Sequence, residues 1–185
     1  MVSLWLAIVA AAIGVFIASS IVHMVLPYHR TDVRKLPAEK EDAMLEVLQR
    51  VAVAPGDYAL PHAGSSAGMR DPAFIAKAEK GPLAFMTVAP GARPSMGPSL
   101  ALWFAYCLVV SACTALLVWQ IVGAGANPTL AFHYGSLISF LAYGMALPQH
   151  SIWYRRSWAT TFKSLFDSVI YGVVTGAVFA YLWPK

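Results

Sequence analysis

Charge is scarce in this sequence. Only 12% of its 185 residues are charged, whereas 58% are hydrophobic. Soluble domains usually carry about 25% charged residues, so a chain this poor in charge cannot cover a surface that faces only water. We therefore predict an integral membrane protein, with membrane lipid as its main surrounding partner.

Cysteine is scarce as well. The chain has two cysteines, Cys107 and Cys113, in the same apolar segment. Six helical residues separate their side chains by about 240° around the axis, which excludes a disulfide between them. No CxxC pair is present, so a redox or zinc motif of that kind is excluded too. We interpret both as small packing residues.

Motifs of familiar chemistry are also missing. The sequence contains no GxSxG elbow, no P-loop and no HExxH pair, so we predict no catalytic residue and no organic cofactor. The net charge is +4, but the basic residues flank hydrophobic segments. They do not cluster with aromatic side chains that could contact nucleic-acid bases. We therefore expect no nucleic-acid partner.

Long apolar runs are what the sequence does have. Four segments, at 1–27, 99–122, 129–147 and 164–183, reach or nearly reach the roughly 20 helical residues that cross a bilayer. A backbone in lipid must satisfy its own hydrogen bonds, and the alternation typical of barrel strands is absent. We predict an all-α membrane protein with a four-helix transmembrane bundle. The first run is long for a cleaved signal peptide, so we expect it to be retained.

Basic residues predict the orientation. Arg30, Arg34 and Lys35 follow the first run, and a second basic group, Arg155, Arg156 and Lys163, lies between the third and fourth. The short connection 123–128 has no Lys or Arg. Because Lys and Arg stay on the cytoplasmic side, we expect connections 28–98 and 148–163 in the cytoplasm and both termini outside.

In the polar connection 28–98 we predict two short helices, near 38–52 and 72–80, that lie on the membrane face. The first has an apolar stripe at helical spacing, and the second has Asp71 as an N-cap and Gly81 as a terminator. Residues 81–98 contain four prolines, so we expect an extended segment without regular structure.

The fourth run carries a stripe of small residues every four positions: Ser168, Gly172, Gly176 and Ala180. Such a stripe lets another helix approach closely. Two interpretations stay open at this point. The stripe packs against a helix of the same chain, or it docks a protein partner or a second copy.

Histidine and one carboxylate supply the candidate metal ligands. The predicted topology puts His23, His29, His150 and Asp167 near the cytoplasmic face, and His62 in the cytoplasmic connection. Imidazole and carboxylate suit Zn or Fe. No pair has the spacing of ligands on one helical face, and His23 and His29 flank Pro27. Histidines that bond only water or backbone, and a carboxylate favoured by a helix N-terminus, are the structural alternatives.

The segments PYHRTDVRKLP, APGDYALPH, GPLAFMTVAPGARPSMG and SIWYRRSWATTFKSLFDSVIYGVVTGAVFAYLWP resemble those of uncharacterised bacterial inner-membrane proteins of about this size. The resemblance implies four transmembrane helices in a bacterial inner membrane. It implies no activity, cofactor or catalytic residue.

Three functions follow as hypotheses. The few intramembrane charges and the small-residue stripe favour a non-catalytic accessory or scaffold subunit. A His-based metal-binding membrane protein or enzyme is the first alternative. A small-solute transporter or channel is the second, although we see no internal repeat and no polar stripe along any helix.

Overall fold

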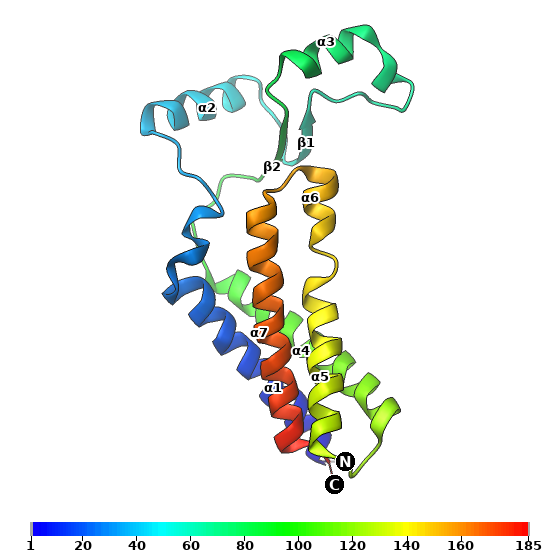
Figure 1. The fold of residues 1–185 in the computed structure, drawn as a ribbon. Helices are drawn as coiled ribbons and strands as arrows, with labels where there is room; N and C mark the ends of the chain where they lie inside the picture. Colours follow the sequence, from blue (N-terminus) through cyan, green and yellow to red (C-terminus); the bar gives the residue numbers. More distant parts are fainter. Residues whose placement is uncertain (1, 185) are drawn as a thin grey trace. The chain divides into compact units, whose positions relative to one another are not determined.

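The computed structural model describes residues 2–184, and the chain divides into two compact units. One unit combines residues 1–33 with 95–185, and the other comprises residues 34–94. The first unit is helical and contains the long apolar segments (Figure 1). The second holds two short helices and a two-stranded sheet.

The helical unit contains four helices that are long and apolar enough to cross a membrane. They cover Leu4–Val25, Gly97–Val122, Pro128–Tyr154 and Trp158–Leu182, with 22, 26, 27 and 25 residues. Each exceeds the roughly 20 residues that a hydrocarbon core requires. The chain is therefore a candidate multi-pass membrane protein, in agreement with the composition.

The first of these helices changes its winding before it ends. Helix α1 runs from Val2 to Ser20 and continues as a π-helical turn, Ile21–Val25. Leu26 is extended, and Pro27 opens a short 3-10 helix that ends at Thr31. The chain thus bends sharply between His23 and His29, because Pro27 lacks the N–H that would continue the helix.

The remaining helices of this unit have a proline at one of their first two positions or begin after a polar residue. They are α4 (Gly97–Val122), α5 (Pro128–Gly144), α6 (Pro148–Tyr154) and α7 (Trp158–Leu182). Asn127 caps α5 by accepting from the Thr129 N–H at 2.8 Å. Helix α7 begins earlier than the expected residue 164, because Thr161 is buried and bonds Ser151 of α6 at 2.7 Å. The connection expected at 148–163 is therefore largely helical.

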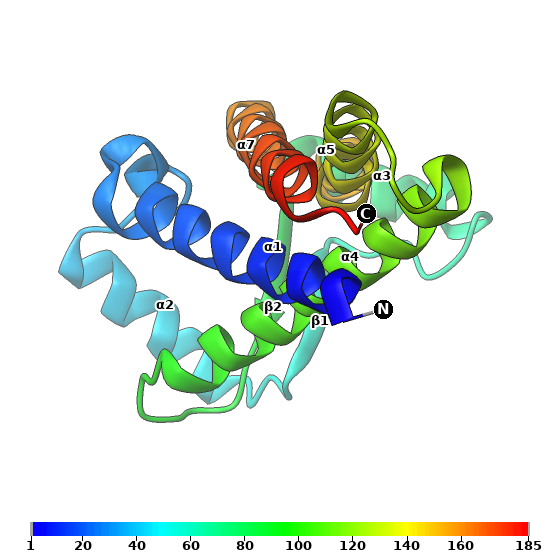
Figure 2. The ribbon, with the colours of Figure 1, turned by 90° about the horizontal axis from the view of Figure 1, so that it is seen from below.

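Helices α5 and α7 lie side by side, and the small-residue stripe faces α5 (Figures 1 and 2). A Cβ on Gly172 would lie 2.7 Å from the Ser136 carbonyl oxygen of α5, and one on Gly176 would lie 2.6 Å from the Phe132 carbonyl oxygen. Of the two interpretations of the stripe, this is the packing that the intramolecular one predicts. Helix α1 packs against α4 and α7 through small residues such as Ala7 and Ala11.

The second unit contains α2 (Ala38–Arg50), β1 (Gly56–Leu60), α3 (Pro72–Lys80) and β2 (Ala84–Val88). Asp71 caps α3 by accepting from the Ala73 N–H at 2.9 Å, and Gly81 ends it with a φ of 59°. Strands β1 and β2 pair antiparallel, with Gly56 opposite Val88 and Leu60 opposite Ala84. The expectation that 81–98 lacks regular structure was therefore wrong for Ala84–Val88, a proline-free run rich in β-forming residues.

Candidate functional site

Three of the five candidate ligands meet in the helical unit. His23 lies in the π-helical turn, His29 in the 3-10 helix after Pro27, and Asp167 in α7. Within residues 2–184, they form a group whose ligand atoms all lie within 4.8 Å of one another. We refer to these three residues as the His–Asp cluster.

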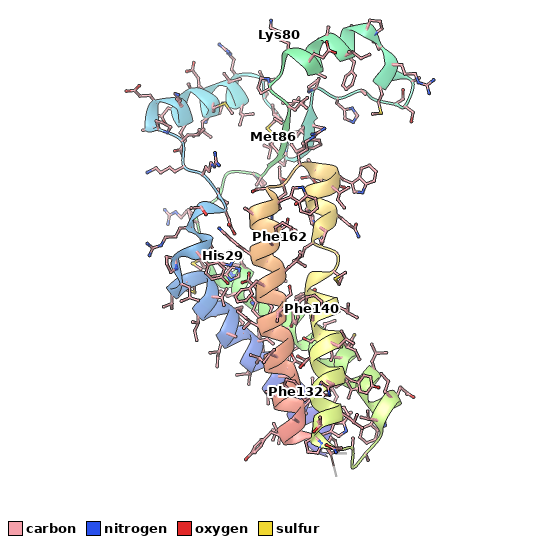
Figure 3. The ribbon with its side chains drawn as sticks, viewed as in Figure 1. His29, Lys80, Met86, Phe132, Phe140 and Phe162 are labelled. Atoms are coloured by element: carbon pink, nitrogen blue, oxygen red, sulfur yellow. The ribbon has the colours of Figure 1, made fainter. Side chains whose placement is uncertain are left out.

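The sharp bend at Pro27 brings the two histidines together. Their rings stack with centroids 4.3 Å apart and planes 18° apart. Helix α7 supplies the carboxylate, and Asp167 is only 2% exposed. Figure 3 shows His29 on the segment that follows α1, between that helix and α7. The cluster is therefore built from the end of the first spanning helix, the 3-10 helix that follows it, and α7.

His29 bridges two carboxylates. Its Nδ1 lies 2.6 Å from Asp32 Oδ2, and its Nε2 lies 3.0 Å from Asp167 Oδ2. Because a carboxylate can only accept, Nδ1 carries the proton. The Nε2 atom is buried and makes no hydrogen bond of normal geometry in the described part of the chain. In a neutral ring, its lone pair would face an acceptor oxygen.

Such a contact requires a proton or a metal ion between the two atoms. A proton on His29 Nε2 or on the Asp167 carboxyl would satisfy it, as would a metal ion bound by both groups. A proton on Nε2 should donate along the N–H direction, and the geometry of a hydrogen bond to Oδ2 is not met. The imidazole of His23 lies nearby and could serve as a third ligand of a metal ion. A proton shared by His29 and Asp167 would involve only those two groups. These three side chains could therefore hold a metal ion.

The separations suit a small transition metal after limited closure. Tetrahedral zinc binds nitrogen and oxygen at about 2.0–2.2 Å, so its ligand atoms lie about 3.3–3.6 Å apart. The cluster atoms lie within 4.8 Å of one another, so closure by up to about 1.5 Å is required. Rotation of the exposed His23 side chain can provide this movement.

A second group of residues holds the ligands in place. Lys163 Nζ donates to the Tyr28 carbonyl oxygen at 2.5 Å, to Thr31 Oγ1 at 2.8 Å and to Asp32 Oδ1 at 2.8 Å. Asp32 in turn holds His29. A carboxylate on the non-ligating nitrogen of a histidine is the usual support of a metal ligand, because it fixes the ring and raises its basicity.

The pKa values of the supporting groups agree with these roles. Burial acts to raise the pKa of Asp32, but the hydrogen bonds from His29 and Lys163 outweigh it, so the pKa lies below its usual value. Asp32 is therefore an ionised acceptor for His29. Burial, followed by the hydrogen bond to Asp167 and that carboxylate's charge, raises the pKa of Tyr28 far above its usual value. Tyr28 thus stays protonated and donates to Asp167 Oδ1.

The other two candidate ligands have different surroundings. His150 lies in α6 with its ring 5.9 Å from that of Tyr154, and it is not a member of the cluster among residues 2–184. His62 belongs to the second unit, where its Nδ1 accepts from the Gly64 N–H at 3.1 Å. The supporting residues Tyr28, Asp32 and Lys163 were not expected as site residues. The one pattern in the sequence that could have indicated them is His29 three residues before Asp32.

Similarity to known proteins adds no function to this cluster. No protein-family model matches the chain, and neither a curated protein nor a solved structure matches it. The function therefore has to be argued from the side chains themselves.

Proposed function

We propose that this chain is a membrane protein that binds one transition-metal ion of the zinc or iron class through His23, His29 and Asp167. The observation that carries the proposal is the contact of His29 Nε2 with Asp167 Oδ2, at 3.0 Å and without a hydrogen bond. Two nitrogens and a carboxylate oxygen are ligands that both metals accept.

Charge supports the binding of a cation. When both are ionised, Asp32 and Asp167 carry two negative charges, and Lys163 pairs with Asp32. With neutral histidines, the site then keeps one negative charge on the buried Asp167, where burial penalises an unpaired ion. A divalent ion offsets that penalty.

The number of ligands indicates the kind of metal site. Three protein ligands leave one position of a tetrahedral ion open, which is the arrangement of catalytic zinc sites, whereas structural zinc sites use four protein ligands. Both His23 and Asp167 also line a cavity. The open position would therefore face a space that a second molecule can enter.

The accessory role expected from the sequence is the competing function. In that case, the cluster only ties the segment after α1 to α7, and His29 carries two protons. The small-residue stripe supports the accessory role less strongly than we expected from the sequence, because α5 of the same chain packs against it. A docked protein partner or second copy stays a prediction.

The decisive experiment is a metal titration of the purified full-length protein in mild detergent. After removal of metal with EDTA and reloading with Zn²⁺, elemental analysis should give about one equivalent per chain. His23→Gln, His29→Gln and Asp167→Asn should each weaken binding by at least about tenfold. The matched controls His62→Gln, His133→Gln and His150→Gln should bind as the wild type does.

Two results would contradict the proposal. One is less than about a tenth of an equivalent of Zn²⁺, Fe²⁺ or Cu²⁺ in the wild type, because a site with these ligands should fill at micromolar metal. The other is undiminished binding by His29→Gln together with a loss in a control variant. Either result would leave the accessory role as the better hypothesis.

We also propose a bacterial inner-membrane location with both termini outside and residues 28–98 and 148–163 in the cytoplasm. The basic groups beside α1 and α7 support this orientation. Ser66→Cys and Ala124→Cys, each in a background of Cys107→Ser and Cys113→Ser, provide a matched test. A membrane-impermeant maleimide added to spheroplasts should label the cysteine at 124 and spare the one at 66. The reverse pattern would invert the topology.

A further inference from the structure

The helical unit contains a cavity of about 550 Å³ beside the His–Asp cluster. The end of α1 and its π-helical turn, the start of α4, the end of α5 and the first half of α7 line it. The indole N–H of Trp103 donates to Ser19 Oγ at 2.8 Å. Figure 2 shows that the end of α1 and the start of α4 diverge. The volume is in the range of pockets that hold a small organic ligand.

Three serine hydroxyls in the cavity lining already donate their protons to backbone carbonyls. Ser20 Oγ donates to the Phe16 carbonyl at 2.8 Å, Ser164 Oγ to the Thr160 carbonyl at 3.0 Å, and Ser168 Oγ to the Ser164 carbonyl at 2.8 Å. Each oxygen keeps its lone pairs for another partner. Together with the Asp167 carboxylate in the same lining, these groups accept hydrogen bonds. A ligand must therefore bring donors to them.

The charge of the lining limits the ligand further. Among the described lining residues, Asp167 is the one acidic side chain, and no Lys or Arg is present. A phosphate or carboxylate group there would face Asp167 without a basic partner in metal-free protein. An ammonium group would be repelled once a divalent ion is bound. A hydroxyl suits both states, since it donates to the carboxylate and offers a lone pair to a metal.

Other parts of the cavity lining are apolar. Leu100, Trp103 and Leu147 contribute to them, and Met24 and Met96 are exposed. All of these residues except Met96 belong to helices that are long and apolar enough to span a bilayer. An alkyl chain can therefore enter from the membrane. The volume suits one chain with a small head group and is too small for a whole two-chain phospholipid.

We infer that this cavity binds a single-chain amphiphile with an uncharged, hydroxyl-bearing head group, of the monoacylglycerol class. The head group lies against Asp167 and the serine hydroxyls, and the chain lies along Trp103. The inference deepens the proposed function by naming the ligand beside the metal. It is tested in metal-free protein, so its failure and the failure of metal binding are separate results.

The test is quenching of Trp103 fluorescence in EDTA-treated, full-length protein in detergent. The probe is a monoacylglycerol with a dibrominated 18-carbon chain, because bromine quenches an indole that it contacts. The fluorescence of Trp103 is obtained as the difference between the emission of the wild type and that of Trp103→Phe. The monoacylglycerol should quench this fluorescence to a saturating level. The free fatty acid and the lysophosphatidic acid with the same chain should bind at least about tenfold more weakly, because each places an anion beside Asp167.

Two variants on one helix separate cavity binding from partition into the micelle. Ser20→Phe fills the polar end of the cavity and should abolish saturable quenching. Ile17→Phe adds the same ring at a position that is 53% exposed and should leave quenching unchanged. Unchanged helical circular dichroism checks that both variants fold.

Three outcomes would overturn the inference. They are the absence of Trp103 quenching, quenching that does not saturate with any probe, and tighter binding of the acidic amphiphiles than of the monoacylglycerol. Quenching that survives in Ser20→Phe as strongly as in Ile17→Phe would have the same effect.

Discussion

The contact between α5 and α7 is tight enough to predict the effect of a single methyl group. In Gly176→Ala, the new Cβ would lie 2.6 Å from the Phe132 carbonyl oxygen, whereas ordinary contacts begin at 3.4 Å. The Ser136 side chain is also in the way, but it can rotate because its Oγ makes no hydrogen bond in the described structure. The carbonyl belongs to the backbone of α5 and cannot. The two helices must therefore move apart by about 0.8 Å at this point.

The magnitude follows from two opposing effects. Overpacking of this kind costs about 1–3 kcal/mol, while replacing a helical glycine by alanine returns up to about 1 kcal/mol. We expect Gly176→Ala to lower the free energy of unfolding by about 1–2 kcal/mol. The neighbouring Ala177 is exposed, so Ala177→Leu adds a larger group away from α5 and should change stability by less than about 0.5 kcal/mol.

Equilibrium unfolding in mixed micelles with increasing sodium dodecyl sulfate, followed by circular dichroism, measures both variants. If Gly176→Ala is as stable as the wild type or more stable, α5 does not lie against this face of α7. The intramolecular interpretation of the small-residue stripe would then be refuted.

Three further predictions concern the site and the thiols. Lys163→Met removes three hydrogen bonds that hold the segment after α1, so Zn²⁺ affinity in a competition titration should fall about 10–100-fold; an unchanged affinity would show that Lys163 only orients the chain. Asp32→Asn should weaken Zn²⁺ binding in the same titration, because the amide holds His29 less firmly, and affinity equal to wild type would count against that support. In detergent, N-ethylmaleimide should modify Cys113, which faces outward from the helices, faster than the buried Cys107, as mass spectrometry of the peptides would show; the reverse order would mean that α4 packs differently.

The positions of the spanning segments were predictable because the solvent selects them. A run of about 20 apolar residues has one low-energy state in a bilayer, so composition alone places it. The capping residues of α3 were predictable for a similar local reason, since Asp71 and Gly81 act within one helical turn. The pairing of β1 with β2 was not, because the two strands are joined through α3 and nothing local sets their register.

The His–Asp cluster could be named from the sequence but not assembled. His23 and His29 share no helical face, and their meeting depends on the bend at Leu26 and Pro27, which no spacing rule describes. Lys163 was interpreted as an orientation signal, although its ammonium group holds three oxygens of the segment after α1. Long-range contacts of this kind leave no pattern in the sequence. Each partner belongs to a different helix or turn, and the local sequence of that element determines how it folds.

The π-helical turn makes residues 21–25 sensitive to changes in length. Such a turn holds one more residue than an α-helical turn, so it shifts the register of all that follows. Deleting Ile21 or Val22 would leave the hydropathy and length of the first span almost unchanged, yet along a continued helix it would turn His23 by about 100° around the helix axis. Aligned relatives should therefore vary freely in which apolar side chains they carry across this stretch, but never in how many.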